Sequence, residues 1–414
     1  MPGLITERNF PTSWTIKRFK YCAQICNGGE YSDIEVEEGG YPVIGSGGEF
    51  ARASKFSYCG KSVLLGRKGT VDKPLFVDGA FWCVDTMFYT KIKDFMYEKY
   101  LYYCALCFPF DYYVTSTALP SMTQRDLGSQ EIAVPPKKDQ KAIADFLDKE
   151  CAQIDSIAAD LEKQIALLQQ YKKSLITEIV TKGLDKSVPM KDSGVEWLGK
   201  IPAHWNFKRL KFMLENSSDS MKVGPFGSAL SGSDFTDEGK WVYNQRVVLD
   251  NNFSENATFV SEEKFQEMRS FAVYPGDILI TTRGTIGKVA IVPEGANEGI
   301  LHPCIIKFRV DKEMIIPELL QLIFNESDFV KDQFTLMSNA TTIEVIYSYS
   351  LKDILLPVIP ADEQEKIYGY LSKKCIAIDG IISEKQKALA TIIQHKKSLI
   401  YEYVTSKKRV KEVR

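Results

Sequence analysis

An internal repeat is the sequence feature that most limits how this chain can fold. Residues 136–143, PKKDQKAI, align without a gap with residues 360–367, PADEQEKI, at an offset of 224. The ungapped match extends to the motif Lys-Lys-Ser-Leu-Ile, which stands at 172–176 and again at 396–400. A self-match of this length indicates that one structural unit occurs twice.

A second matched motif lies upstream and has a different offset. Residues 11–20, PTSWTIKRFK, align with residues 202–211, PAHWNFKRLK, at an offset of 191. The segment between the matched ends is therefore 33 residues longer in the second half. Each half thus combines a short Trp-containing motif, a body of variable length and a constant helical segment.

The constant segments have the pattern of coiled-coil helices. Residues 139–182 contain neither Pro nor Gly, and apolar residues recur there every seven positions, as they do over about 362–407. Because an apolar stripe is unfavourable in water, we expect the two helices to pair with each other in antiparallel fashion. The predicted seam consists of Leu147, Ile154, Leu161, Leu168, Leu175, Leu371, Ile378, Ile392 and Leu399.

The bodies between the helices contain short β-prone runs and Gly-rich turns, which predict mixed α/β domains. The predicted fold class is α+β, with two globular domains separated by two long antiparallel coiled-coil helices in a pseudo-two-fold repeat. The predicted segments are a first globular domain at 1–136, a first spacer helix at 137–186, a second globular domain at 187–360 and a second spacer helix at 361–414.

Charge and composition limit the partners of the chain. The formal net charge is −2, residues 187–360 carry 17 basic and 23 acidic residues, and residues 361–414 carry 12 and 7. Such a chain has no large positive electrostatic field to hold DNA by itself, so a basic partner would supply part of any phosphate contact.

No apolar run approaches a membrane span and no secretion signal is visible, so we expect a cytoplasmic protein with no membrane contact. We expect the nine cysteines to be buried thiols in a reducing compartment.

A loop rich in Gly and Thr recurs in both bodies and carries a basic side chain. It stands at 65–71, LGRKGTV, and at 281–288, TTRGTIGK, each time after a strand-like run. Such a loop offers backbone N–H groups, hydroxyls and a guanidinium to phosphate or guanine. The predicted contact residues are Arg67, Lys68, Thr70, Thr281, Thr282, Arg283, Thr285 and Lys288. Ser46 and Arg52, near the Gly-rich turn at 45–48, and Gln245 and Arg246 are secondary candidates.

The sequence offers little to catalysis. The segment ending in Gly287-Lys288 has Thr282 where a phosphate-binding loop needs its first Gly, and Val289 where it needs Ser or Thr. The three His residues stand in no triad or metal pattern, and only Cys104 and Cys107 form a C-x-x-C pair. We therefore expect no cofactor, no metal and no catalytic centre; an enzyme with its own nuclease or methyltransferase centre is disfavoured.

The layout resembles the specificity subunit of type I restriction–modification systems. The resemblance rests on residues 192–205, DSGVEWLGKIPAHW, on residues 41–48, YPVIGSGG, on the helical motifs around Gln140 and Gln364, and on the Lys-Lys-Ser-Leu-Ile endings. In residues 1–14 the first Trp motif lacks the Gly-rich lead of the second.

This resemblance implies two target-recognition domains, each reading one half of an interrupted double-stranded DNA site, with the helices as a fixed spacer. It also implies assembly with two modification (adenine methyltransferase) subunits and with motor-nuclease restriction subunits. Two bodies of unequal length predict an asymmetric target. The alternative is a coiled-coil scaffold that joins proteins without recognising bases.

Overall fold

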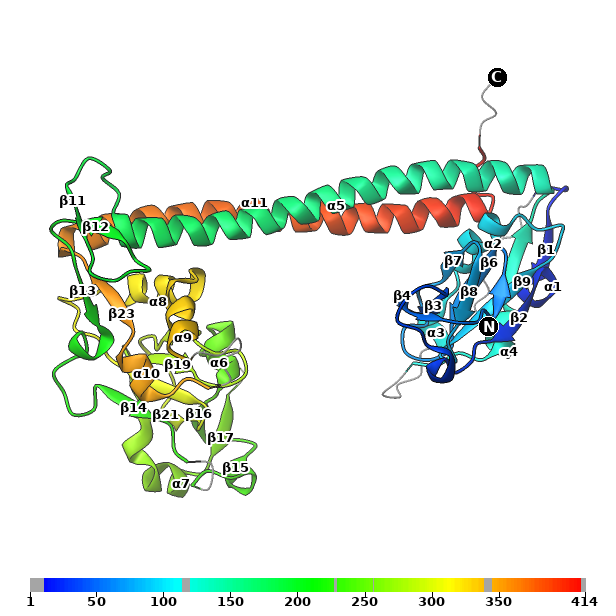
Figure 1. Cartoon of the computed structure of the whole chain (residues 1–414). Coiled ribbons are helices and arrows are strands. Elements are labelled where there is room, and N and C mark those ends of the chain that lie inside the picture. Colours follow the sequence, from blue (N-terminus) through cyan, green and yellow to red (C-terminus); the bar gives the residue numbers. More distant parts are fainter. Residues whose placement is uncertain (1–10, 114–119, 227–228, 256, 339–344, 411–414) are drawn as a thin grey trace. The chain divides into compact units, whose positions relative to one another are not determined.

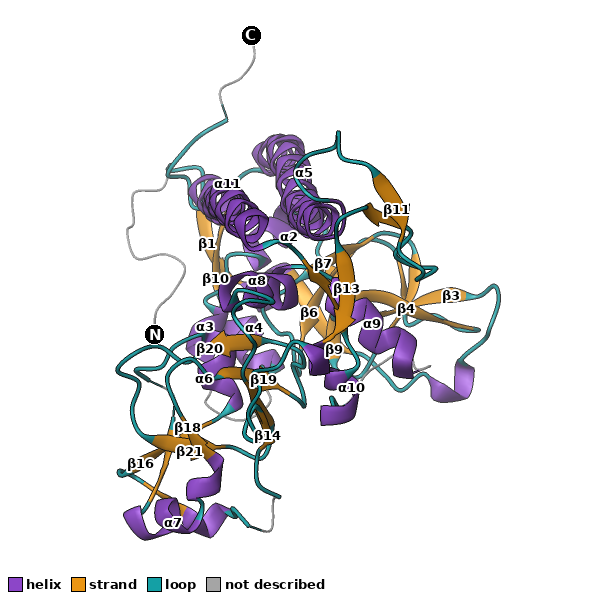
Figure 2. Cartoon of the chain, turned by 90° about the vertical axis from the view of Figure 1, so that its left-hand side faces the viewer, coloured by secondary structure: helices purple, strands orange, loops and turns teal. Residues whose placement is uncertain are grey.

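The computed structural model describes residues 11–113, 120–226, 229–255, 257–338 and 345–410. The chain forms two compact units, each of which mixes helices and strands (Figures 1 and 2). Unit 1 comprises residues 1–163 and 385–414, and unit 2 comprises residues 164–384. Among the described residues, no helix is both long and apolar enough to cross a membrane.

Unit 1 contains two four-stranded sheets, with strand orders β2-β9-β6-β7 and β4-β3-β8-β5, and a separate β1-β10 ladder. The strands are β1 Thr15–Arg18, β2 Ala23–Asn27, β3 Tyr41–Gly45, β4 Gly48–Ala53, β5 Tyr58–Cys59, β6 Ser62–Gly66, β7 Leu75–Val77, β8 Ala80–Cys83, β9 Met87–Ile92 and β10 Glu131–Val134. The short helices are α1 Phe19–Cys22, α2 Glu98–Ala105, α3 Phe110–Tyr113 and α4 Gln124–Ser129.

Unit 2 contains a four-stranded sheet of order β14-β22-β19-β20, a five-stranded sheet of order β15-β17-β16-β21-β18, and the ladders β13-β23 and β11-β12. The strands are β11 Met190–Asp192, β12 Lys200–Pro202, β13 Asn206–Arg209, β14 Met221–Val223, β15 Phe235–Thr236, β16 Lys240–Tyr243, β17 Thr258–Val260, β18 Ala272–Val273, β19 Ile278–Thr281, β20 Val289–Ile291, β21 Gly299–Leu301, β22 Ile305–Phe308 and β23 Leu355–Val358. The short helices are α6 Gln245–Asp250, α7 Glu262–Glu267, α8 Pro317–Glu326, α9 Phe329–Ser338 and α10 Ser348–Lys352.

The sheets of the two units correspond, except that the edge strand β15 of unit 2 has no counterpart among the described strands of unit 1. The first sheet has the same order in both, and in the second sheet the parallel pair β3-β8 of unit 1 matches the parallel pair β16-β21 of unit 2. In the small ladders, Thr15 pairs with Val134 and Asn206 pairs with Val358, which reproduces the sequence offsets of 191 and 224. The repeat therefore extends through the bodies, although their sequences have diverged.

The two long helices are α5 Lys137–Lys182 and α11 Ala361–Val404. Within each unit, one half of α5 pairs in antiparallel direction with one half of α11. Lys396 lies 2.7 Å from Asp155 in unit 1, and Lys172 lies 2.7 Å from Asp379 in unit 2. These ion pairs are related by the offset of 224. The predicted fold class, with two mixed domains, two long paired helices and a pseudo-two-fold repeat, is confirmed.

The helical seam is closed most completely where a globular body covers it. Leu147, Leu175, Leu371, Ile378 and Leu399 are buried, and each joins the hydrophobic core of its own unit. The remaining predicted seam residues, Ile154, Leu161, Leu168 and Ile392, are half-buried. Two helices shield only one side of each apolar stripe, so the middle positions stay partly open to water. Each compact unit contains about half of both long helices together with one globular body, and the bounds of the four predicted segments stay predictions.

A buried glutamine near the start of each long helix joins that helix to its body. The Gln140 side chain accepts from the Tyr97 N–H (2.7 Å) and donates to the Pro135 carbonyl (2.8 Å). In unit 2, Gln364 accepts from the Ile316 N–H (2.9 Å) and donates to the Ile359 carbonyl (2.8 Å). Tyr97 and Ile316 directly precede α2 and α8, whose N-caps have no side-chain hydrogen bond. Each glutamine therefore caps a helix of the adjacent body.

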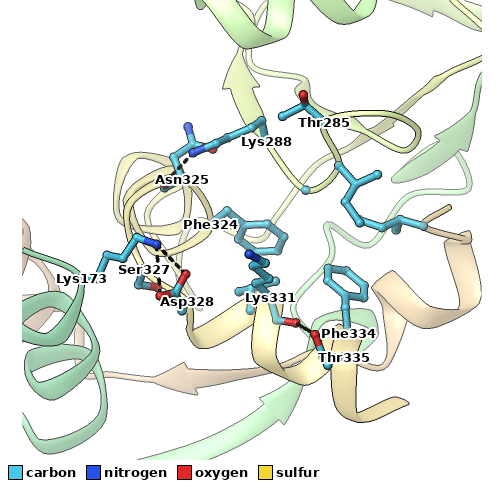
Figure 3. A pocket seen from close by; sticks show the side chains of 14 residues that line it. Lys173, Thr285, Lys288, Phe324, Asn325, Ser327, Asp328, Lys331, Phe334 and Thr335 are labelled. Carbon is cyan, nitrogen blue, oxygen red and sulfur yellow. Dashed lines mark hydrogen bonds and ion pairs between the residues drawn. The ribbon is translucent and has the colours of Figure 1, made fainter. Parts of the chain in front are cut away.

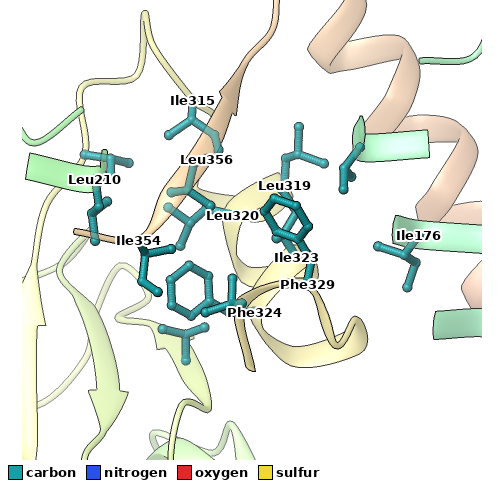
Figure 4. Close-up of a cluster of buried hydrophobic side chains, with 14 of the residues drawn as sticks. Ile176, Leu210, Ile315, Leu319, Leu320, Ile323, Phe324, Phe329, Ile354 and Leu356 are labelled. Atoms are coloured by element: carbon teal, nitrogen blue, oxygen red, sulfur yellow. The ribbon is translucent and has the colours of Figure 1, made fainter. Parts of the chain in front are cut away.

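Apolar side chains of the body and of the long helices form one core in each unit. In unit 2, α8 presents Leu319, Leu320 and Ile323 towards β23, and Ile176 of α5 lies on the other side (Figure 4). The Trp motif contributes Trp205, which is fully buried and donates its indole N–H to Glu363 near the start of α11 (3.0 Å). The repeated sequence motifs thus form the junction between body and helix.

Candidate DNA interface

The Gly-Thr loop has the same backbone environment in both units. It connects β6 to β7 in unit 1 and β19 to β20 in unit 2, and these strands pair antiparallel. Lys68 forms a bridge with Ser121, and Arg283 forms the equivalent bridge with Val345. Ser121 and Val345 are related by the offset of 224. Lys68, rather than Arg67, therefore occupies the position of Arg283.

This correspondence explains the glycine that follows each cation. Gly69 has φ +80° and Gly284 has φ +64°, which is a left-handed backbone conformation that residues with a Cβ rarely adopt. At this turn the chain reverses direction between two antiparallel strands. The shared motif is thus a basic residue, a left-handed Gly and a Thr, with Thr70 equivalent to Thr285.

The two equivalent cations are free to bind a ligand. Lys68 and Arg283 are exposed, and no described residue forms a hydrogen bond or ion pair with either charged group. Arg67 differs, because its guanidinium donates to the Asp85 carbonyl (3.1 Å) and lies over the Phe88 ring. Of the two basic residues in the loop of unit 1, Lys68 is therefore the one equivalent to Arg283.

A second segment lies beside the loop in unit 2. The Gln245 side chain donates to the Thr285 carbonyl at 3.4 Å, and a Cβ at Gly284 would lie 3.3 Å from the Gln245 amide nitrogen. Gln245 is the first residue of α6, whose N-cap Asn244 accepts from the N–H of Arg246. Arg246 is exposed and its Nε lies 3.6 Å from Asp250. The structure therefore groups Gln245 and Arg246 with Arg283 and Thr285.

The corresponding segment of unit 1 is the Gly-rich turn after β3. Val84 N–H donates to the Ile44 carbonyl, and His302 N–H donates to the Tyr243 carbonyl, both at 3.2 Å. Gly45 is thus equivalent to Asn244, and Ser46 is equivalent to Gln245. Two candidates that the sequence analysis treated as unrelated occupy one position in the two units.

Four predicted contact residues are directed elsewhere. Thr281 and Thr282 are buried, because β19 continues to Thr281 and the Thr282 hydroxyl donates to the Cys304 carbonyl (2.9 Å). The Lys288 ammonium donates to the Asn325 carbonyl (2.6 Å), and burial lowers its pKa, although nearby Glu326 opposes this. Arg52 donates to the carbonyls of the Gly39-Gly40 turn and binds Glu49. These four side chains interact with groups of their own unit, and their contact with DNA stays a prediction.

The described residues contain no group of three or more His, Cys, Asp or Glu side chains that could hold a metal ion. All nine cysteines are free thiols. Five of them, including Cys104, are buried, and burial raises the pKa of Cys107 to about 12. Cys59 is exposed, so the expectation that all the cysteines are buried was wrong.

Two equivalent modules, each with a basic Gly-Thr loop and a helix-capping glutamine, define a duplicated protein whose halves present related surfaces. A family model described as "Type I restriction modification DNA specificity domain" matches residues 11–167 and again residues 222–390. These matches cover most of the chain, which therefore belongs to this family.

Curated relatives are consistent with this assignment. The chain is 25% identical over 302 residues to the type I restriction enzyme MjaVIII specificity subunit of Methanocaldococcus jannaschii, which covers 72% of this chain. It is 23% identical over 337 residues to the type I restriction enzyme EcoBI specificity subunit of Escherichia coli, covering 76% of this chain and 69% of that protein. The chain spans 66% of the length of the MjaVIII subunit.

A solved structure supports the fold. It is described as the structural basis underlying complex assembly and conformational transition of the type I R-M system. One of its chains matches with a TM-score of 0.66 and 14% identity, over 96% of this chain and 99% of that one. At this identity the likeness concerns the fold alone.

Proposed function

We propose that this protein is the DNA-reading subunit of a type I restriction–modification complex and carries no catalytic centre of its own. The observation that carries the proposal is a loop cation at equivalent positions in the two units, which is exposed and has no partner among the described residues. Arg283 and Lys68 both follow a buried strand and precede a left-handed Gly. A cation presented in this way suits contact with phosphate or with the guanine edge in the major groove.

The neighbours of the two loops differ, which supports a bipartite and asymmetric target. Unit 2 places Gln245 and Arg246 beside its loop, and these side chains suit adenine and guanine. Unit 1 places Ser46 at the position of Gln245, and the other basic residue of its loop, Arg67, donates to the Asp85 carbonyl. Different side chains on the same frame would read different bases.

The partners follow from the family and from the charge of the chain. With a net charge of −2, the protein needs basic partners to neutralise phosphates along the DNA. We infer that two modification subunits, one for each unit, supply these contacts and the methyl-transfer chemistry, and that restriction subunits join the full complex. The paired long helices would serve as a spacer of constant length.

The test is a map of adenine methylation in a host that expresses the modification subunits with and without this gene. We expect one interrupted motif that depends on the gene. Arg283→Ala should relax recognition at one half-site by about 1–3 kcal/mol, and Lys68→Ala should affect only the other half. The matched control is Arg269→Ala, which removes an exposed arginine of unit 2 outside the loop.

Two results would count against the proposal. The first is an unchanged methylation pattern when the gene is removed and the modification subunits are intact. The second is an equal loss at both half-sites with an Arg283→Ala variant whose thermal unfolding matches that of the wild type. Equal loss with a lowered unfolding temperature would instead indicate a general folding defect of the variant.

A further inference from the structure

A lysine and an aromatic residue stand side by side on the surface of each unit, just after β1 in unit 1 and β13 in unit 2. They are Lys20 and Tyr21 of α1, and Lys211 and Phe212 of the 3-10 helix Leu210–Phe212. The lysine Nζ lies over the neighbouring ring in both pairs, 5.0 Å from the ring centroid in unit 1 and 5.3 Å in unit 2. The pairs are related by the offset of 191, and we call each of them a basic–aromatic pair.

The packing of the bodies explains the neighbours of the pair but not the pair itself. The residues on either side are fully buried in both units, namely Phe19 and Cys22 in unit 1 and Leu210 and Met213 in unit 2. The two aromatic residues between them are 59% and 62% exposed. An exposed ring adds little buried apolar surface to the fold. Its recurrence at equivalent positions therefore indicates contact with something outside the chain.

In unit 1 the pair lies beside a short helix that begins next to the Gly-Thr loop. The backbone bridge of Lys68 joins the loop to Ser121, and α4 begins three residues later at Gln124. The helix α1 packs against α4, and a Cβ at Gly128 would lie only 3.3 Å from the Lys20 Cβ. Lys68 and Lys20 therefore lie near opposite ends of α4.

Unit 2 has the same arrangement around α10. The bridge of Arg283 joins the loop to Val345, and α10 begins three residues later at Ser348. Lys211 lies 3.1 Å from the carboxylate of Asp353, which directly follows α10. In both units the loop cation and the basic–aromatic pair thus lie at opposite ends of one helix.

The length of this helix fits the spacing of DNA phosphates. α4 has six residues and α10 has five, which corresponds to about 8–9 Å. Phosphates of one strand recur roughly every 3.4 Å along the duplex axis, so the ends of the helix are about two or three phosphates apart. Between the ends, α4 presents exposed Arg125 and α10 presents exposed Tyr349 at the equivalent position. The ends of this surface are therefore alike in the two units, whereas its middle differs.

The ionic environment of the pair differs between the units. No described residue forms an ion pair with Lys20. In unit 2 Lys211 shares Asp353 with Arg209, and both nitrogen–oxygen distances are 3.1 Å. Ser129 holds the position of Asp353 in unit 1, at the offset of 224. The ammonium of unit 1 can therefore bind an anion without losing an ion pair.

Other lysines near the Gly-Thr loop of unit 2 are already bound within that unit. Lys288 donates to the Asn325 carbonyl, and Lys173 lies 3.0 Å from Asp328. Both lysines line a pocket of about 490 Å³ together with residues of α8 and α9 (Figure 3). These two cations are partnered inside unit 2, in contrast to Arg283.

We propose that the basic–aromatic pairs hold the DNA backbone without reading its sequence, one pair in each unit. The ammonium contacts a phosphate and the ring packs against the adjacent deoxyribose. The backbone is the same at every sequence, which fits a pair of the same chemistry in both units, whereas the neighbours of the two Gly-Thr loops differ. The inference rests on the proposed function, because that function supplies the DNA.

The salt dependence of DNA binding tests the proposal. We titrate the complex of the full chain with its modification subunits against a duplex with the methylated motif and against a shuffled duplex. Lys20→Gln should weaken binding of both duplexes by the same factor and lower the slope of log affinity against log salt by about 0.9, the loss of one phosphate contact. Lys211→Gln should act in the same direction but by less, because Lys211 has to leave Asp353.

Conservative and distant substitutions serve as controls. Lys20→Arg should keep the slope, since it keeps the charge. Lys55→Gln in unit 1 and Arg269→Gln in unit 2 remove exposed cations outside the pairs and the Gly-Thr loops, and should leave the slope unchanged.

The ring is tested separately from the charge. Tyr21→Phe should bind as the wild type does, because Phe212 has no hydroxyl at the equivalent position. Tyr21→Ala should weaken binding of both duplexes about two- to fivefold and leave the salt slope unchanged, because it removes a contact that is not ionic. Thermal unfolding at the wild-type temperature excludes misfolding of each variant.

Three results would overturn the proposal. The first is an unchanged slope and affinity in a variant that carries both Lys20→Gln and Lys211→Gln. The second is a changed methylated motif in that variant, since the lysines would then read bases. The third is loss of a modification subunit from the complex in native mass spectrometry, since the pairs would then bind protein. Failure of the proposed function differs from all three, because the wild-type complex would then direct no sequence-specific adenine methylation.

Discussion

The glutamine cap offers a sharp test of how the bodies are held to the long helices. Gln364 is 1% exposed and makes three hydrogen bonds to backbone groups, at Ile316 N–H, Met314 O and Ile359 O. Gln364→Leu keeps the approximate volume of the side chain but leaves these groups without partners. The Ile359 carbonyl lies in a fully buried environment, whereas the other two bonds are only partly buried.

The expected magnitude follows from this difference in burial. A buried polar group without a partner costs about 1–3 kcal/mol, and groups that water can reach cost less. We therefore expect Gln364→Leu to lower the free energy of unfolding by roughly 2–4 kcal/mol, which is a large part of the stability of an ordinary domain. Gln140→Leu should act similarly in unit 1, because its hydrogen bonds are equivalent.

Urea unfolding gives the free energy, and hydrogen exchange followed by mass spectrometry shows which unit has opened. In Gln364→Leu the loss of protection should concentrate in α8 and leave α2 unchanged. The control is Gln169→Leu, since Gln169 is an exposed glutamine on α5 in the same unit. If Gln364→Leu and Gln169→Leu both change stability by less than about 0.5 kcal/mol, the cap does not hold the body to the helix.

Three further perturbations test individual contacts, each by urea unfolding. Lys172→Met should lower the free energy of unfolding by about 1–3 kcal/mol and Lys396→Met by less than about 1 kcal/mol. The reason is burial, because the Lys172 side chain is 10% exposed and the Lys396 side chain 30%. Equal losses in the two variants would contradict this reasoning. Lys307→Met should cost about 3 kcal/mol, because Lys307 and its partner Asp277 are 2% and 1% exposed; a neutral result would mean that Arg309 alone satisfies Asp277. Gly284→Val should cost about 1–2 kcal/mol through its left-handed φ of +64°; it should also weaken recognition at the unit 2 half-site only, as read from the methylated motif.

The long helices and their pairing could be predicted because the heptad pattern and the ungapped repeat are both written in the sequence. The offset of 224 even predicts the two ion pairs, since Asp155 and Lys172 correspond to Asp379 and Lys396. The sequence could not predict how completely the seam is buried. Ile154 and Leu147 have the same heptad position and both pack against the core of unit 1, but Leu147 is fully buried and Ile154 only half-buried.

The candidate interface was predicted only in part, because its residues are brought together by hydrogen bonds between distant segments. The recurrence of the Gly-Thr loop identified Arg283 and Lys68. Residue type alone could not show that the Thr282 hydroxyl is already bound to the Cys304 carbonyl, or that Arg52 supports a turn. Nor could it show that Ser46 and Gln245 are equivalent, since this depends on which carbonyl accepts from Val84 and His302.

The backbone bridges also show where this architecture can change in length. The offset between equivalent residues is 191 at the Trp motifs, 199 at Ser46 and Gln245, 215 at Lys68 and Arg283, and 219 at Tyr97 and Ile316. Nearly half of the 33 extra residues of the second body thus lie between Gln245, which follows β16, and the Gly-Thr loop. This stretch contains α6 and α7. Between the Gly-Thr loop and the capped residues Tyr97 and Ile316, the two bodies differ in length by only four residues. An insertion between Gln245 and Arg283 should be tolerated. An insertion between Arg283 and Ile316 would instead move the Gly-Thr loop relative to α8.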